Sequence, residues 1–146
     1  MIVLGSDHAG FKLKEHIRKF LEKKGCGYVD MGTYKYNKTD DYPDFAKKVA
    51  MQVVKDKSKG ILVCGSGIGV CIAANKVKKI RAALCHDVRS AKASRIDGDT
   101  NILCLSGNRT KKDLASKIVT AWLNTKPSNA VRHKRRIKKI AKIENA

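Results

Sequence analysis

The sequence is short of acidic side chains, aromatic rings and long apolar runs, and each shortage narrows the classes of protein it encodes. Only 13 aspartates and glutamates stand against 32 lysines and arginines, a formal net charge of +19 over 146 residues. Three phenylalanines, four tyrosines and one tryptophan are too few for the stacking platform of single-strand nucleic-acid binders. The longest apolar stretch, residues 61–74, is interrupted by glycines and too short to cross a bilayer, so we expect no membrane partner.

The excess of positive charge would attract phosphate groups of any kind, including those of nucleic acids. Lysines outnumber arginines, however, and are scattered along every predicted helix. This distribution favours solvated helix faces, so we expect nucleic acid not to be the partner. A non-catalytic basic binding protein stays open as an alternative.

The chain also lacks any Cys-x-x-Cys pair. An odd number of cysteines, several of them within apolar runs, indicates free thiols in a reducing compartment. No basic segment followed by an apolar core marks a secretory signal at the N-terminus. We therefore expect a cytoplasmic protein. The cysteines are Cys26, Cys64, Cys71, Cys85 and Cys104.

Against these absences, residues 60–76 (GILVCGSGIGVCIAANK) carry the strongest local signal. A continuous apolar run bounded by glycines predicts a buried parallel strand that ends at Cys64. The glycines that follow allow a sharp turn and close approach to a ligand, and a helix N-terminus behind the turn favours anions. A thiol near the positive end of a helix dipole ionises more readily than a thiol in free cysteine. The turn matches neither the dinucleotide fingerprint nor the P-loop, and a plain tight turn beside a buried cysteine is the alternative.

The rest of the chain alternates between strand and helix patterns. This alternation predicts an α/β fold, a three-layer α/β/α Rossmann-like domain with a five-stranded parallel sheet, in one domain spanning residues 1–146. A polar loop is expected over 32–41 and a turn over 97–99. The predicted strands are 1–5, 28–31, 60–64, 81–85 and 101–105, and the predicted helices are 11–24, 42–54, the run from the glycine turn to 76, 86–96, 111–123 and 129–143.

Functional residues are expected where the strands end, at the carboxyl edge of the sheet. The last helix, 129–143, is amphipathic and strongly basic, and we expect it to protrude beyond the sheet. It would pack either on a partner subunit or back on its own domain.

Six segments together resemble the ribose-5-phosphate isomerase B family and its galactose-6-phosphate and allose-6-phosphate relatives. The resemblance covers nearly the whole chain, in order. The segments are 5–11, 41–46, 64–69 with 73–76, 81–85, 99–101, and Arg132-His133-x-x-Arg136.

This resemblance implies an aldose–ketose isomerase of the pentose phosphate pathway, without metal or cofactor, that works through a cis-enediolate. It interconverts ribose 5-phosphate and ribulose 5-phosphate; a hexose-6-phosphate isomerase is the nearest alternative. Cys64 matches the base, and Ser66 matches a residue that polarises the sugar oxygens. Members are dimers or tetramers with shared sites, so we expect a homodimer or homotetramer.

The resemblance also implies the binding residues. The backbone of the glycine turn would cradle the enediolate, and the other residues would hold the sugar and its phosphate. Asn101 would contact substrate or hold a loop. The implied binding residues are Asp7, His8, Tyr42, Gly65, Gly67, Ile68, Gly69, Asn101, Arg109, Arg132 and Arg136.

The chain departs from the family where His-Asn usually precedes the segment 99–101. Here the pair is Asp97-Gly98, so the histidine thought to open the sugar ring is absent. Asp97 is the candidate replacement, although a carboxylate is a poorer acid than an imidazole at neutral pH. His86, a histidine of another subunit, and spontaneous ring opening are the alternatives. The turn before Arg109 is also one residue longer than usual.

Overall fold

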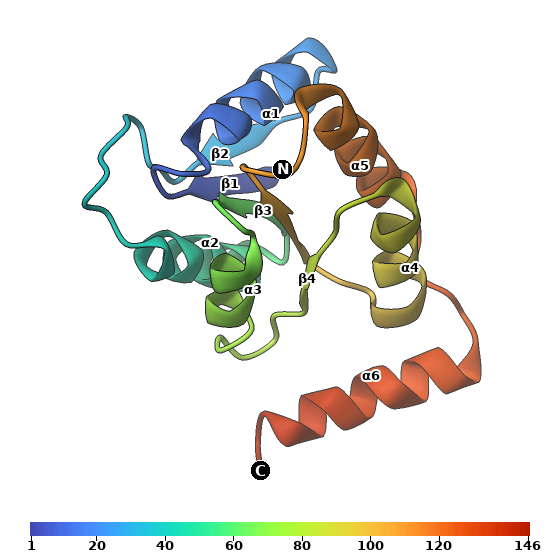
Figure 1. Ribbon diagram of the computed structural model, residues 1–146. Coiled ribbons are helices and arrows are strands. Elements are labelled where there is room, and N and C mark those ends of the chain that lie inside the picture. Colours follow the sequence, from blue (N-terminus) through green and yellow to red (C-terminus); the bar gives the residue numbers. More distant parts are fainter.

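The computed structural model describes residues 1–146 and shows one five-stranded sheet between two layers of helices (Figure 1). All strand pairs are parallel, in the order β2-β1-β3-β5-β4, which confirms the predicted Rossmann-like class. The strands are β1 Ile2–Ser6, β2 Tyr28–Asp30, β3 Lys59–Cys64, β4 Ala82–Leu84 and β5 Ile102–Ser106.

Helices α1, α4 and α5 cover one face of the sheet, and α2 and α3 cover the other (Figure 1). Sequence patterning located every one of them to within a few residues. The helices are α1 Phe11–Lys23, α2 Tyr42–Asp56, α3 Ile68–Ala74, α4 Val88–Gly98, α5 Lys112–Asn124 and α6 Val131–Ile143.

The central strands are largely apolar because both of their faces are buried. In β3, Ile61 and Val63 join the core under α1 and α5, whereas Leu62 and Cys64 join the core under α2 and α3. Successive side chains of a strand point to opposite faces, so a strand between two layers needs apolar residues at every position. This explains the continuous apolar sequence from Ile61 to Cys64.

The strand order reverses between β1 and β3, and this fixes the place of the site. The chain leaves β1 through α1 on one face and leaves β3 through α3 on the other. Such a switch point opens a crevice at the carboxyl ends of the two strands. Ser6 pairs with Val63 in the register, so the ends of β1 and β3 lie side by side.

The predicted turn over 97–99 is wrong. Helix α4 continues through Gly98 and ends only at Asp99, which adopts a left-handed conformation (φ 43°). The guanidinium of Arg95 donates to the Asp99 carboxylate at 2.8 Å, which stabilises this last turn. This contact between residues four apart on the same helix stabilises the helix past a glycine that would ordinarily end it.

Helix α6 stands apart from the three layers (Figure 1) and lies on the amino side of the sheet, against the loop before β4 and the end of α4. The segment that leads into α6 is held by a hydrogen bond from the Ser128 N–H to the Ile96 carbonyl (3.1 Å). The C-terminal end of α6 is held by a hydrogen bond from the Lys79 N–H to the carboxylate of Glu144 (2.9 Å). Only His133 is buried among its residues. No helix of the chain has the length and apolar character needed to cross a membrane.

The fold contains one buried ion pair whose loss should be costly. The ammonium of Lys14, 1% exposed, donates to Asp30 at 2.6 Å. We expect Asp30→Asn to lower the free energy of unfolding by about 3 kcal/mol, because a buried ammonium is left without its counter-charge.

Urea denaturation measures this loss, with Glu15→Gln as the matched control. Glu15 pairs with Arg18 at 2.6 Å, but both of these side chains are more than a quarter exposed. Loss of the Glu15–Arg18 ion pair should lower the free energy of unfolding by less than about 1 kcal/mol. Equal effects of the two substitutions would contradict the role given to the Lys14 pair.

Candidate active site

The glycine turn after β3 holds the Cys64 thiol at the carboxyl end of a central strand. The N–H of Gly67 donates to Sγ of Cys64 at 3.2 Å, so the turn curls over the sulfur. The hydroxyl of Ser106, at the end of β5, donates to the Gly65 carbonyl at 2.7 Å. Cys64 is 3% exposed and belongs to the core under α2 and α3.

Two glycines allow the elements around the sulfur to approach so closely. Gly67 has a φ of 76°, and a Cβ there would lie 2.9 Å from the Leu105 carbonyl carbon. A Cβ on Gly10 would lie 2.4 Å from the Val63 carbonyl oxygen. The turn between β1 and α1 therefore lies directly against the end of β3.

That neighbouring turn brings Asp7 and His8 to the same edge of the sheet. Asp7 is 5% exposed and accepts from the N–H of Gly10 at 2.9 Å, and burial raises the pKa of its carboxyl. Nδ1 of His8 lies 2.6 Å from Oδ1 of Asp40, and this hydrogen bond raises the pKa of the imidazole. A buried carboxyl thus stands beside an imidazole whose protonated form is favoured by Asp40.

Helices α2 and α3 supply the remaining groups near the thiol. The ring of Tyr42, 40% exposed, fills the space that a Cβ on Gly69 would occupy. The hydroxyl of Ser66 is exposed and accepts from the N–H of Ile68 at 3.1 Å, which leaves its own proton free to donate outward. The exposed Arg109 follows β5 and therefore lies at the same edge.

Four predicted site residues lie at the opposite edge of the sheet. Asp97 lies in the last turn of α4, and Asn101 immediately precedes β5. Arg132 and Arg136 belong to α6, which lies on that amino side of the sheet. A strand of five residues is about 17 Å long. Within one chain, these four residues are therefore not brought together with Cys64.

Two of these four residues have partners of their own. Asn101 accepts from the N–H of Arg81 and donates to the Lys79 carbonyl, both at 2.8 Å, so it holds the loop before β4. The carboxylate of Asp97, 64% exposed, lies 3.5 Å from Nε2 of His133. Of the two roles expected for Asn101, the structure supports that of holding a loop.

The closest gathering of potential metal ligands is formed by Asp7, His8 and Asp40, whose donor atoms all lie within 4.8 Å of one another. The 2.6 Å separation between the His8 and Asp40 atoms is that of a hydrogen bond. Nδ1 of His8 is therefore engaged with Asp40, which leaves Nε2 as the free ring nitrogen.

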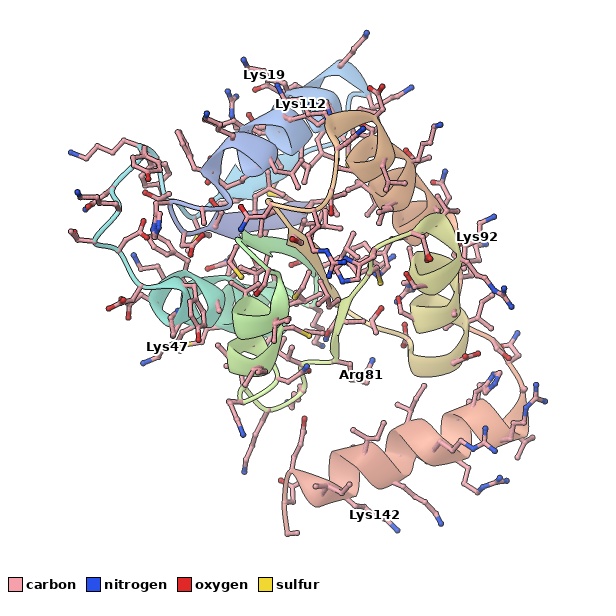
Figure 2. The ribbon with its side chains drawn as sticks, in the orientation of Figure 1. Lys19, Lys47, Arg81, Lys92, Lys112 and Lys142 are labelled. Carbon is pink, nitrogen blue, oxygen red and sulfur yellow. The ribbon has the colours of Figure 1, made fainter.

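The charged side chains elsewhere are spread over the molecule. Figure 2 shows labelled lysines on five different helices, which agrees with solvated helix faces. These are Lys19, Lys47, Lys92, Lys112 and Lys142.

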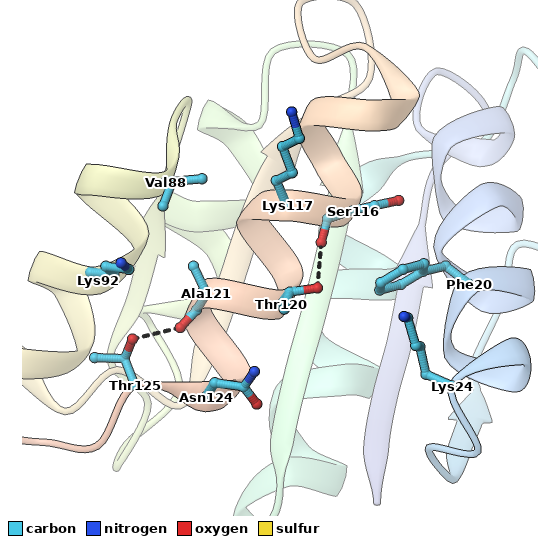
Figure 3. Close-up of a pocket in the computed structure, with 10 residues that line it drawn as sticks. All are labelled: Phe20, Lys24, Val88, Lys92, Ser116, Lys117, Thr120, Ala121, Asn124 and Thr125. Atoms are coloured by element: carbon cyan, nitrogen blue, oxygen red, sulfur yellow. Dashed lines mark hydrogen bonds between the residues drawn. The ribbon is translucent and has the colours of Figure 1, made fainter.

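A groove of about 690 Å³ lies between α1, α4 and α5 (Figure 3). Two of its hydroxyls are already used by the backbone, since Thr120 donates to the Ser116 carbonyl and Thr125 to that of Ala121. The remaining hydroxyl, that of Ser116, lies 2.8 Å from Nε2 of His16, and none of the residues expected at the site lines this groove.

Sequence reasoning missed Asp40 and Ser106. Asp40 comes from a polar loop without periodicity, and only the fold brings it to His8, 32 residues away. Ser106 belongs to no motif of its own, and its hydrogen bond to the Gly65 carbonyl requires the pairing of β3 with β5.

The fold and this site define a Rossmann-like α/β enzyme that presents a thiol and an acid–imidazole pair at its switch point. The chain belongs to the ribose/galactose isomerase family, whose model matches residues 2–140. The chain is similar to ribose-5-phosphate isomerase B of Escherichia coli (strain K12), with 41% identity covering 98% of this chain and 95% of that protein.

Two solved structures extend the similarity to three dimensions. Ribose-5-phosphate isomerase B of Clostridium thermocellum is 45% identical, with a TM-score of 0.94, over 99% of this chain and 97% of that one. The Mycoplasma genitalium enzyme with bound ribulose-5-phosphate is 42% identical, with a TM-score of 0.94, over 99% of this chain and 95% of that one.

The close approach at Gly67 makes a testable prediction. Gly67→Ala should lower the free energy of unfolding by about 2 kcal/mol or more, because the new Cβ meets backbone and the conformation is left-handed. Gly98→Ala is the control: a Cβ there has only an ordinary contact of 3.7 Å. Urea denaturation of both variants tests this, and a wild-type midpoint for Gly67→Ala would refute it.

Proposed function

We propose that this chain is an aldose–ketose isomerase that interconverts ribose 5-phosphate and ribulose 5-phosphate. The observation that carries the proposal is the Cys64 thiol, held at the carboxyl end of β3 by the N–H of Gly67. The family membership and the ribulose-5-phosphate in the Mycoplasma genitalium structure support this pair of substrates.

In the proposed reaction Cys64, as thiolate, takes the proton from C2 of the open-chain aldose and returns it to C1. The intermediate is a cis-enediolate, and the proton shift between its oxygens completes the ketose. Atoms and electrons balance within the sugar, so the step consumes no cofactor. The outward-facing hydroxyl of Ser66 and the N–H groups of the turn would stabilise the enediolate oxygens, where negative charge develops.

The neighbouring groups would hold the rest of the substrate. We assign the buried carboxyl of Asp7 to the sugar hydroxyls and the imidazole of His8 to the phosphate. Tyr42 would line the substrate site. Arg109, in the turn after β5, would add positive charge near the phosphate. All four lie at the carboxyl edge with Cys64.

Asp97, Arg132 and Arg136, at the amino edge of the sheet, can contact the substrate only if the site is shared between subunits. We propose a homodimer, or a tetramer built from such dimers, in which α6 brings Arg132 and Arg136 to the thiol of its partner. Residues four apart share a helix face, and neither guanidinium forms an ion pair within its own chain. Two guanidinium groups on one face suit a phosphate.

Exposed apolar side chains support this assembly. Ile68 and Ile72, more than half exposed, lie one turn apart on α3 beside the glycine turn. Val131 and Ile143 at the two ends of α6 are more than 70% exposed. Burial of such residues against a second subunit would stabilise a dimer. In it, Asp97 beside His133 would serve the partner's site as the acid–base group that opens the furanose ring.

The role of Cys64 is tested with ribulose 5-phosphate in heavy water. This substrate is an open-chain ketose, so ring opening does not enter the measurement. We expect wild-type protein to exchange the C1 proton, followed by NMR, and Cys64→Ala to slow the exchange about 1,000-fold while the fold is retained. Cys26→Ala should exchange at the wild-type rate. Undiminished exchange in Cys64→Ala would exclude the thiol as base.

The shared site is tested by mixing two inactive variants. Cys64→Ala and the double variant Arg132→Ala/Arg136→Ala should each have little activity as homodimers. In a mixed dimer, one of the two sites combines an intact thiol with intact arginines. After unfolding and refolding together, an equal mixture should regain about a quarter of wild-type activity. If thiol and arginines acted within one subunit, no activity would return.

A further inference from the structure

Asp40 makes two hydrogen bonds to one residue of the candidate site. Its Oδ1 accepts from the backbone N–H of His8 at 3.1 Å and lies 2.6 Å from the ring nitrogen Nδ1. The ring of Tyr36, from the same loop, packs edge-on against the imidazole with centroids 5.6 Å apart. The imidazole is therefore fixed in position from two sides.

The contact with Asp40 determines where the protons of the ring lie. A carboxylate only accepts, so Nδ1 carries a proton directed at Asp40, and Nε2 is left to interact elsewhere. A negative charge at this distance also favours the doubly protonated ring. In that form Nε2–H donates, which suits a phosphate oxygen.

The surroundings of Asp40 indicate that its charge is retained for a purpose. Its side chain is only 11% exposed, and its second oxygen, Oδ2, is buried without a hydrogen-bond partner. A carboxylate oxygen left unsatisfied costs stability, so such groups in native proteins call for an explanation. The contact with His8 supplies one.

We propose that Asp40 is a positioning residue that keeps His8 as an imidazolium whose Nε2 donates to the substrate phosphate. The proposal rests on the proposed function, in which His8 contacts that phosphate. Asp40 itself touches no reacting atom. It would act on substrate affinity through His8, and it would leave the proton transfer at Cys64 untouched.

The charged groups facing the imidazole all act in the same direction. Asp40, from the loop before α2, contributes most to raising the pKa of His8, and Asp7, from the turn after β1, raises it further. Tyr36 contributes an uncharged ring edge. Below its raised pKa the imidazole is cationic, and above it the charge is lost. Removal of Asp40 should therefore weaken phosphate binding at neutral and mildly alkaline pH more than at mildly acidic pH.

The test uses Asp40→Asn, which keeps an oxygen for both hydrogen bonds and removes only the charge. The four histidines give few imidazole signals, and His8→Gln assigns that of His8. We expect NMR titration to show a lower pKa for His8 in Asp40→Asn than in the wild type. The KM for ribose 5-phosphate should rise about tenfold at pH 8 and less than twofold at pH 6, with kcat nearly unchanged.

Two further variants complete the design. Asp44→Asn removes the same charge from the exposed start of α2, where it contacts no histidine, and should match the wild type. Asp40→Glu restores the carboxylate and should recover part of the lost affinity at pH 8.

An unchanged titration of His8 in Asp40→Asn would overturn the proposal, as would a KM increase that is equal at both pH values. The titration needs no turnover. If the wild-type protein failed to isomerise ribose 5-phosphate, the proposed function would fall, while the titration would still decide whether Asp40 controls the charge of His8.

Discussion

The structure depends on the close approach of three backbone segments at the carboxyl ends of β1, β3 and β5. The turn after β1 reaches the end of β3 through Gly10, and the hydroxyl of Ser106 at the end of β5 fixes the glycine turn that holds Cys64. Glycine is required because a Cβ would collide with backbone, which cannot move aside as a side chain can. The thiol of Cys64 and the carboxyl of Asp7 thus each accept from a main-chain N–H, and the side chain of Asp40 holds the imidazole of His8.

The same fold separates the positive charge of α6 from the thiol by the length of the sheet. A parallel sheet directs every carboxyl end to one edge, so residues after strands meet there, whereas residues before strands and at the ends of returning helices gather at the other. Asp97, Arg132 and Arg136 belong to the second group. A second subunit is the simplest way to bring the two groups to one substrate, and the exposed apolar residues on α3 and α6 are consistent with it.

Sequence periodicity predicted the elements and the fold class because β3 and β5 contain unbroken apolar runs and the helices repeat apolar residues at helical spacing. It failed at the end of α4, where the contact of Arg95 with Asp99 extends the helix through Gly98. Glycine is commonly found at the end of a helix, so a prediction from sequence ends the helix there. Such a prediction does not take into account that the side chain of Arg95 stabilises the last turn of α4. The strand order was likewise beyond local pattern, since it depends on which crossovers pack on which face.

The sequence alone determined the parallel α/β class, the position of Cys64 at the end of a buried strand and the family resemblance, because each is written in contiguous residues. Tertiary structure decided which candidates meet. It brings Asp40 into contact with His8, 32 residues away, and it places Asn101 where its side chain binds the loop before β4. It also places Asp97 beside His133 at the amino edge of the sheet. Contacts between distant residues arise from sheet order and crossover direction, and these depend on how the whole chain buries its apolar faces.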